Sequence, residues 1–386
     1  MSERTTRGTA VVLSSIRWNF PWQVHHEITA GFARRGYDVL YLEPLPLRWW
    51  PGWDRLRKHA LARLLKQPTR LAESLQPTVS GVNVIWPVGA PDRLPPGLWI
   101  NRRILMPRLA RRLRRKSSGR PLIVFNYLPT SAWLALQEQL VPDVVVYGCT
   151  DDYPNSPYLQ GVPLVEDTVV DSADIVYVTS PALLARMQQH HHNVIHLLPA
   201  VHYEQFEPAR ARHPRHDPPL CVYFGTLSRA NNDYDLLRKV SHRYRLKVIG
   251  PVVDPLDGFA PMTDVVGSVP YDDLPGALAD ADVLLLPYIK TVYMESVIPA
   301  KTFQCLATGK PVVSIGLSSM ETLRDVVDVC DTHEEFLAAI QAAVHEAPKR
   351  RNARLAIAQA NTWKSRIDQL DTAINRVLTE KGFSSE

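Results

Sequence analysis

The chain has 386 residues, enough for two domains that each bury a core of their own. Its hydrophobic content of 45% and charged content of 22% are typical of soluble globular proteins, and it has no run of about 20 apolar residues that would predict a transmembrane helix. The net charge of +5 is uneven, because the first 200 residues carry 23 Lys and Arg against 15 Asp and Glu.

The N-terminus runs from a few polar residues directly into a short apolar strand. It lacks the apolar core and small-residue cleavage site of a signal peptide. The four cysteines are far apart and form no CxxC pair, which argues against a disulfide or zinc framework and fits reduced thiols; they are Cys149, Cys221, Cys305 and Cys330. We therefore expect a cytoplasmic protein.

The first half alternates short apolar strands with amphipathic helices. Residues 9–14 form a predicted strand, 22–35 a helix closed by Gly36, and 38–42 a second strand. Further strands are predicted at 81–86, 121–125, 143–148, 175–179 and 193–197. This alternation implies a parallel sheet covered on both faces, so residues 1–205 form a predicted Rossmann-like domain.

Two basic segments lie in this half. Residues 101–120 contain nine Lys and Arg and no acid, and residues 48–70 place Trp49, Trp50 and Trp53 beside further basic residues. In the first segment Leu105, Leu109 and Leu113 recur at helical spacing beneath Arg108, Arg111, Arg112 and Arg115. Basic residues beside indoles predict binding to an anionic membrane surface. Nucleic acid is the alternative partner, although neither segment contains a recognised nucleic-acid-binding module.

Two adjacent carboxylates, Asp151 and Asp152, follow the strand predicted at 143–148. The carboxyl end of a parallel sheet is where α/β proteins bind ligands. A carboxylate there can act as a general base and take the proton from an attacking hydroxyl. A turn cap is the alternative. A metal site is disfavoured because adjacent side chains on an extended chain point to opposite sides.

The second half repeats the alternation. Residues 199–219 carry five prolines and are interpreted as a linker, after which strands are predicted at 220–224, 245–249, 264–266, 283–286 and 311–314. We predict a second Rossmann-like domain over residues 206–360. The last predicted helix, at about 353–378, crosses back to the first domain, so that residues 361–386 belong with it.

The most informative segment is TVYMESVIPAKTFQCLATGKPVV, residues 291–313. Pro299 suits the first position of a helix, and Gly309 suits the position just past its last turn. Lys301 then lies in the first turn, beside free backbone N–H groups at the positive end of the helix. Such a cation predicts a site for a phosphate or diphosphate. An ordinary solvated lysine is the alternative.

This segment resembles the donor-nucleotide segment of GT-B glycosyltransferases. The resemblance implies an α/β fold of two Rossmann-like domains facing a central cleft, with the nucleotide sugar held by the second domain and without a metal or cofactor. It implies that the donor-binding residues are Gly225, Gly267, Tyr288, Glu295, Ser296, Lys301 and Gln304. His25, at the start of the first helix, is then a candidate contact at the cleft, with a structural histidine as the alternative.

One departure separates the chain from the common retaining type, which carries E-x7-E. Thr302 stands seven residues after Glu295. The K-x-x-Q pattern of Lys301 and Gln304 instead resembles the inverting β-glucuronosyltransferase of xanthan assembly and related polysaccharide and teichuronic-acid glycosyltransferases. The loop of Asp151 and Asp152 resembles the aspartate loop of the same enzyme, which implies Asp151 as the general base and Asp152 as an acceptor-site residue.

Together these resemblances imply a glycosyltransferase that moves a sugar from a UDP-sugar to a lipid-linked or polysaccharide-precursor acceptor with inversion. The basic segments add the expectation that it is peripheral on the inner face of the membrane. The alternatives are a retaining glycosyltransferase of the same fold, a GT-B-fold nucleotide-sugar epimerase, and a non-catalytic binding protein that keeps Lys301.

Overall fold

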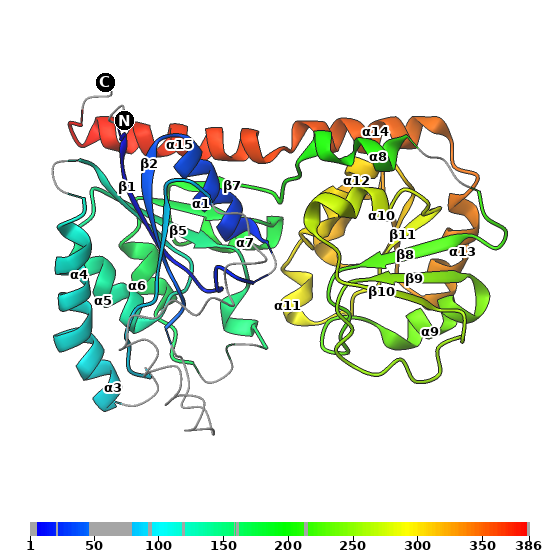
Figure 1. Cartoon of the computed structure of the whole chain (residues 1–386), viewed down its shortest axis with the longest axis horizontal. Helices are drawn as coiled ribbons and strands as arrows, with labels where there is room; N and C mark the ends of the chain where they lie inside the picture. Colours follow the sequence, from blue (N-terminus) through cyan, green and yellow to red (C-terminus); the bar gives the residue numbers. More distant parts are fainter. Residues whose placement is uncertain are drawn as a thin grey trace. The chain divides into compact units, whose positions relative to one another are not determined.

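The computed structural model describes residues 6–20, 22–45, 79–91, 95–117, 120–157, 159, 162–211 and 215–383. Contacts divide the chain into two compact units, both built on a parallel sheet flanked by helices (Figure 1). Unit 1 comprises Met1–Val178, Arg186–Ile195 and Ile367–Glu386, and unit 2 comprises Thr179–Ala185 and His196–Arg366. The predicted pair of Rossmann-like domains is confirmed.

Unit 1 contains a seven-stranded sheet in the order β3-β2-β1-β4-β5-β6-β7. Its strands are β1 (Gly8–Leu13), β2 (Tyr37–Leu42), β3 (Val82–Ile85), β4 (Leu122–Asn126), β5 (Val144–Cys149), β6 (Ile175–Val178) and β7 (Val194–His196). Pairing is parallel, with Val11 of β1 aligned to Leu40 of β2 and Val124 of β4. Because β1, β4 and β5 are buried along their whole length, they appear in the sequence as continuous apolar runs.

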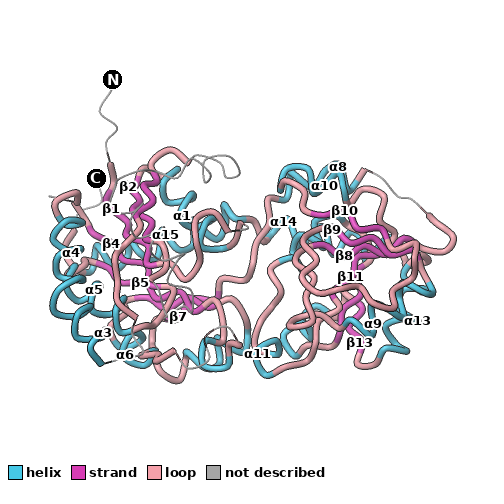
Figure 2. The backbone as a smooth tube through the Cα atoms, turned by 60° about the horizontal axis from the view of Figure 1, so that its bottom comes forward, coloured by secondary structure: helices cyan, strands magenta, loops and turns pink. Residues whose placement is uncertain are grey.

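Helices cover both faces of this sheet, with α1 and α15 on one face and α5 and α6 on the other (Figures 1 and 2). The helices of the unit are α1 (Val24–Arg34), α3 (Pro95–Ile100), α4 (Met106–Arg114), α5 (Ser131–Leu140), α6 (Glu166–Asp171) and most of α15 (Trp363–Glu380), while α7 (Pro181–Met187) is shared by both units. α15 packs tightly on α1, since a Cβ added at Gly31 would lie 2.1 Å from Ile367 Cδ1. Asp371 fixes it further by accepting from Arg7 at 2.9 Å.

Unit 2 contains a six-stranded parallel sheet in the order β10-β9-β8-β11-β12-β13. The strands are β8 (Leu220–Phe224), β9 (Arg245–Ile249), β10 (Asp264–Gly267), β11 (Val283–Leu286), β12 (Val312–Ile315) and β13 (Asp328–Cys330). The first five coincide with predicted strands to within one residue at each end. The three-residue edge strand β13 was not predicted, because it is too short to produce a periodic pattern.

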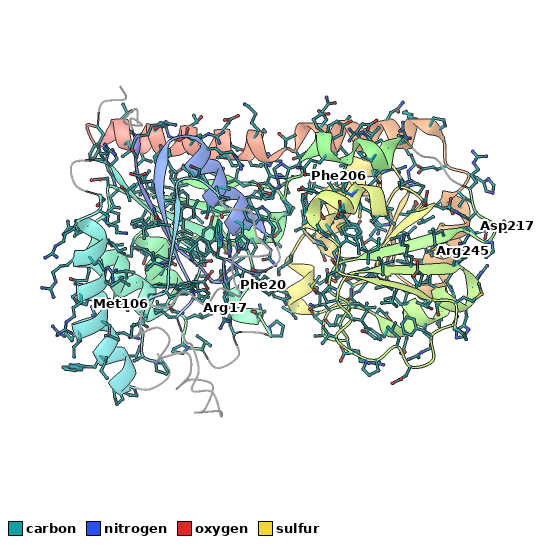
Figure 3. The ribbon with its side chains drawn as sticks, in the orientation of Figure 1. Arg17, Phe20, Met106, Phe206, Asp217 and Arg245 are labelled. Carbon is teal, nitrogen blue, oxygen red and sulfur yellow. The ribbon has the colours of Figure 1, made fainter. Side chains whose placement is uncertain are left out.

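Two cores lie on the two faces of the second sheet. One packs around Phe206, Phe303 and Ala358 under α8 (Glu207–Arg210), α10 (Leu274–Ala277), α12 (Lys301–Thr308) and α14 (Pro348–Ala360); Figure 3 labels Phe206. The other packs around Leu237 and Phe336 under α9 (Tyr234–Arg243) and α13 (His333–Ala343). The short helix α11 (Val292–Glu295) precedes α12.

Three details of the predicted organisation differ from the structure. Residues 199–219 are not a plain linker, because a 3-10 turn (Tyr203–Phe206) and α8 lie within them and Phe206 is fully buried. The break between the units precedes His196, ten residues before the predicted boundary at 205/206. The last predicted helix is two helices, α14 and α15, since the chain leaves helical geometry at Asn361, whose carbonyl accepts from Val201 at 3.1 Å.

No helix in the described part of the chain is long and apolar enough to cross a membrane. All four cysteines are free and buried.

Candidate active site

The helix predicted from the segment 291–313 is α12, which begins at Lys301 after an N-cap at Ala300. Pro299 therefore lies two residues before the helix instead of at its first position. Gly309 ends α12 in the left-handed conformation, with φ 71°, as the sequence predicts. Six of the eight residues of the helix are buried, and only Lys301 and Gln304 are half-buried.

The ammonium of Lys301 is held entirely by neutral groups. Its Nζ donates to the Phe224 carbonyl at 2.6 Å and to the Tyr223 hydroxyl at 3.1 Å. It lies 4.3 Å from the centroid of the Tyr223 ring and 5.5 Å from that of Tyr288, within the range of cation–π attraction. No described carboxylate forms a salt bridge with Lys301. The alternative of an ordinary solvated lysine does not fit this environment.

Burial works to lower the pKa of Lys301, but Tyr288 and then Tyr223 outweigh it and hold the pKa above its ordinary value. Lys301 therefore keeps its charge at neutral pH. Burial raises the pKa of Tyr288 well above its ordinary value, so that its hydroxyl stays neutral. A partly desolvated cation without a paired carboxylate is costly, and an anionic ligand would supply the missing countercharge.

Three glycines form adjacent turns at the carboxyl ends of β8, β9 and β10. Gly225, Gly250 and Gly267 all have positive φ, of 109°, 134° and 78°. A Cβ added at Gly225 would lie 2.5 Å from Lys301 Nζ, and one added at Gly250 would lie 2.4 Å from the Gly225 carbonyl oxygen. Gly250 N–H donates to the Gly267 carbonyl at 2.7 Å. Only glycine combines these conformations with such close approach.

Gly250 was missed in the sequence, although it directly follows the predicted strand 245–249 in the same way that Gly225 follows 220–224. Gly225, Tyr288 and Lys301 lie together around one ammonium group, and Gly267 joins them through Gly250.

The remaining predicted donor residues, Gln304, Glu295 and Ser296, have other partners. Gln304 donates through Nε2 to the Tyr271 hydroxyl at 3.4 Å. Glu295 Oε2 accepts from the backbone N–H of Ser318 at 2.6 Å and from its hydroxyl. The Ser296 carbonyl accepts from the Ser180 hydroxyl at 2.6 Å. Glu295 is thus a carboxylate held in place by one serine.

In unit 1, the two adjacent aspartates at the carboxyl end of β5 have different environments. Asp152 is 5% exposed and its Oδ2 accepts from Asn155 Nδ2 at 2.8 Å, across the 3-10 turn Tyr153–Asn155. Asp151 is half-buried, and its Oδ2 accepts from the Thr150 hydroxyl at 3.5 Å. Asp152 stands at the N-cap position of this turn, but its bond with Asn155 joins two side chains and is not a cap, while Asp151 presents the more accessible carboxylate.

A network of hydrogen-bonded and charged side chains packs against the loop of Asp151 and Asp152. Glu166, at the start of α6, is 8% exposed and accepts from Tyr147 at 2.5 Å. Arg186 donates to both of its carboxylate oxygens, at 2.6 and 3.3 Å. Arg186 also lies 3.4 Å from Cys149 Sγ, which in turn contacts the Asp151 carbonyl at 3.6 Å. In the sequence Glu166 resembles a solvated helix residue, and nothing local there indicates that it is buried and paired.

His25, on the first turn of α1, lies against the same loop. It is 2% exposed, its ring centroid is 3.9 Å from that of Tyr127, and its Nε2 is 3.4 Å from the Thr150 hydroxyl. Burial, followed by the neighbouring His26, lowers the pKa of His25 to about 3. His25 is therefore neutral at physiological pH and is brought together with Thr150 and Asp151.

The predicted basic surface is present on α4. Arg108, Arg111, Arg112 and Arg115 are exposed, and none of them forms an ion pair with a described residue. The apolar stripe differs from the prediction: the fully buried residues are Met106 (Figure 3), Ala110 and Leu113, whereas Leu105 and Leu109 are half-buried at its border. A π-helical turn at Asn101–Leu105 precedes α4, and α5 packs against α4.

Because α5 covers this stripe, α4 presents charge and not an apolar face. Trp99 on α3 is 59% exposed beside it. The second predicted basic segment, 48–70 with Trp49, Trp50 and Trp53, lies outside the described residues.

The described residues include no group of three or more His, Cys, Asp or Glu that could hold a metal ion. The expectation that the site works without a metal stays a prediction.

Comparisons with known proteins define the class of fold. Residues 229–372 match the family model for glycosyl transferase-like proteins. The whole chain is similar to solved GT-B structures, so its fold is that of the GT-B glycosyltransferases. The family match begins just before α9, ends within α15 and includes Lys301, and it indicates a transferase enzyme.

Two solved structures illustrate the likeness. One is Alr3699/HepE from Anabaena in complex with UDP and glucose, with 12% identity, a TM-score of 0.62, and coverage of 96% of this chain and 100% of that one. The other is an α,α-trehalose 6-phosphate synthase from Burkholderia multivorans, with 12% identity, a TM-score of 0.63, and coverage of 98% and 100%. No curated protein shows significant sequence similarity to this chain.

Proposed function

We propose that this protein transfers a sugar from a UDP-sugar to a hydroxyl of a lipid-linked or polysaccharide-precursor acceptor, with inversion at the anomeric carbon. The observation that carries the proposal is the Lys301 ammonium, held by neutral groups beside the Gly225 turn. Its missing countercharge fits a diphosphate. The similarity to a structure that holds UDP and glucose supports uridine as the nucleotide.

In the proposed reaction the acceptor oxygen forms a bond to the anomeric carbon while the bond from that carbon to the diphosphate breaks. Asp151 takes the proton of the acceptor hydroxyl, and UDP leaves with the bonding electron pair. Lys301, with the Gly225 turn, stabilises the negative charge that develops on the diphosphate. The base must be a carboxylate that the acceptor can reach, which favours the half-buried Asp151 over Asp152, whose exposed fraction is 5%.

The donor site is tested by titrating UDP into the wild type and the Lys301→Met variant by calorimetry. We expect Lys301→Met to weaken UDP binding by about 100-fold, since it removes a charge-assisted contact from a partly desolvated site. Lys310→Met is the matched control: Lys310 is a buried lysine of the same unit whose Nζ donates to the Ala279 carbonyl at 2.8 Å. Equal loss of affinity in both variants, or none in either, would contradict the proposed site.

Transfer itself is tested with radiolabelled UDP-glucose and a bacterial polar-lipid extract as acceptor. Label that enters the lipid fraction supports transfer, and the configuration of the new bond by NMR separates inversion from retention. Interconversion of the nucleotide sugar without any acceptor would instead identify an epimerase.

We also propose that the basic face of α4 binds an anionic membrane, largely through charge, with Trp99 at its edge. Neutralising Arg108, Arg111, Arg112 and Arg115 to Gln should weaken binding to phosphatidylglycerol vesicles at low salt by about 1,000-fold, given about 1 kcal/mol per basic residue. The control neutralises four exposed cations of unit 2, Lys239, Arg243, Arg245 and Lys349, which changes the net charge equally. If both quadruple variants bind alike, α4 is not the membrane surface.

A further inference from the structure

The loop that carries Asp151 contains a chain of hydrogen-bonded side chains that has no part in the reaction as proposed above. It runs from His25 on α1 through Thr150 to Asp151, with distances of 3.4 Å between His25 Nε2 and Thr150 Oγ1 and 3.5 Å between Thr150 Oγ1 and Asp151 Oδ2. His25 and Thr150 are 2% and 8% exposed. His25 and Thr150 are 125 positions apart in the sequence, and their contact links α1 to the loop of Asp151.

The protons of this chain can be assigned from the groups that surround it. Thr150 has one O–H, which it donates to the Asp151 carboxylate. The Tyr153 hydroxyl, 3.2 Å from Thr150, donates to the Tyr127 carbonyl. The contact between His25 and Thr150 therefore needs a proton on His25 Nε2. Nδ1 is then the unprotonated nitrogen, and it is buried without a hydrogen-bond partner among the described residues.

His25 cannot serve as the proton acceptor in such a chain. Its ring is packed against Tyr127 and excluded from water, and burial lowers its pKa to about 3, so that it stays neutral when substrate is turned over. A neutral histidine that donates through Nε2 fixes the orientation of the Thr150 hydroxyl. That hydroxyl in turn bonds the charged form of Asp151 and not the protonated form, which favours ionisation of the carboxylate.

We infer that Thr150 and His25 are positioning residues, which hold the Asp151 carboxylate in one orientation and keep it ionised for its role as general base. The inference rests on the proposed function for the role of Asp151, but the hydrogen-bonded chain can be tested without any substrate. The titratable groups around Asp151 come from several elements: His25 of α1, Tyr127 after β4, Cys149 and Tyr153 of its own loop, Glu166 of α6, and Arg186. The carboxylate of Asp152 is the next side chain in the same loop, and Glu166 and Arg186 pair with each other.

The test follows the Asp151 carboxyl by carbon-13 NMR across pH in the wild type and in Thr150→Val, with the resonance assigned by its loss in Asp151→Asn. Thr150→Val keeps the shape of the side chain and removes the hydroxyl. We expect it to raise the pKa of Asp151 by about 0.5 to 1 unit, because one hydrogen bond to the charged form is lost. Thr150→Ser, which keeps a hydroxyl, should restore the wild-type value.

Thr29→Val is the matched control. Thr29 lies one turn after His25 on α1, is 1% exposed, and its hydroxyl has no partner among the described residues. It should leave the pKa of Asp151 unchanged. If Thr150→Val and Thr29→Val give the same Asp151 titration, the inference is wrong. Nitrogen-15 spectra of the imidazoles give a second check: His25 should be in the Nε2–H form at pH 7, and an imidazolium or Nδ1–H form would overturn the chain.

Activity then separates this inference from the proposed function. If Asp151→Asn abolishes transfer and Thr150→Val moves the acidic limb of the pH–rate profile to higher pH, the role of Asp151 as base and the positioning role of Thr150 are both supported. If Asp151→Asn stays fully active while the NMR shift is present, the role of Asp151 as base fails and only the hydrogen-bonded chain remains. An unchanged acidic limb in Thr150→Val, with Asp151→Asn inactive, would overturn the inference alone.

Discussion

The Lys301 site of unit 2 and the Asp151 site of unit 1 each hold one charged side chain, but different kinds of group surround that side chain. Both lie at the carboxyl ends of parallel strands, where an α/β sheet presents its loops to a ligand. Around Lys301 the polar partners are one backbone carbonyl, that of Phe224, and the Tyr223 hydroxyl, and the glycine turn at Gly225 leaves room for the ammonium. The Asp151 carboxylate instead accepts from the side chain of Thr150, which contacts His25 of α1, and Tyr147 of β5 and Glu166 of α6 bond to each other beneath the loop.

This difference decides how each site should respond to mutation. A site built from backbone turns tolerates change of its neighbours' side chains, but not the addition of a Cβ where the chain approaches closely. A site built from a side-chain network loses function when any member is truncated, because a buried partner is left unsatisfied. The predictions below separate the two kinds of site.

The largest effect is expected at the carboxylate itself. Asp151→Asn should lower turnover of radiolabelled UDP-glucose by about 1,000-fold, as removal of a general base does, while UDP affinity stays unchanged. Asp152→Asn should change turnover only a few-fold, because an Asn carbonyl can still accept from Asn155. If Asp152→Asn loses most of its turnover while Asp151→Asn stays active, then Asp152 and not Asp151 is the general base.

The buried pair beneath that loop should control the stability of unit 1. Arg186→Met leaves the Glu166 carboxylate buried without its cation, and we expect a loss of about 2 to 3 kcal/mol in the free energy of unfolding by urea. This loss is smaller than is usual for a fully buried pair because the Arg186 side chain is 31% exposed. Lys290→Met is the control, since it removes one partner of an exposed pair with Asp331 and should leave the unfolding midpoint where it is. Equal effects of the two substitutions would contradict the prediction.

These two sites also explain how far the sequence could predict the structure. The strands were predictable because parallel strands buried on both faces are continuous apolar runs, as in Val144–Cys149. The donor helix was predictable because its signals are local, with Gly309 ending it and Lys301 in its first turn. The short strand β13 and the break between α14 and α15 depend on contacts made elsewhere in the fold.

The network around Asp151 could not be predicted in the same way. Glu166 is adjacent to Asp167 in a short polar helix, and its burial depends on Tyr147, 19 residues away, and on Arg186, 20 residues away. Thr150 becomes informative only when His25 is placed beside it. Sequence periodicity contains no signal for such pairings, whereas a glycine turn or a helix cap is encoded within a few residues.

The pH dependence of stability should differ between the wild type and a variant without His25. Its pKa is about 3 in the folded protein and about 6.5 in an unfolded chain, so the unfolded state binds more protons between these values. The contribution of neutral His25 to the free energy of unfolding is fully present above pH 6.5 and is lost as the pH falls towards 3. At pH 5 the loss is about 2 kcal/mol relative to pH 7.

His25→Phe keeps an aromatic ring against Tyr127 and removes the titrating group. Urea unfolding at pH 7 and pH 5 should therefore show a smaller loss of stability in the variant than in the wild type. His26 stays in both proteins, so its own titration cancels from the comparison. The same loss in both would mean that His25 is protonated in the folded state.

The smallest effect is expected at the glycine turns, where it can be separated from simple strain. Gly225→Ala and Gly267→Ala both place a side chain at positive φ, but only the Cβ at Gly225 meets Lys301 Nζ, at 2.5 Å, while the one at Gly267 meets nothing within 4 Å. Both variants should be destabilised by about 1 kcal/mol through the backbone. Only Gly225→Ala should also weaken UDP binding, by about tenfold, because the ammonium must move. If Gly267→Ala weakens binding as much, strain in the turns, and not the position of Lys301, sets the affinity.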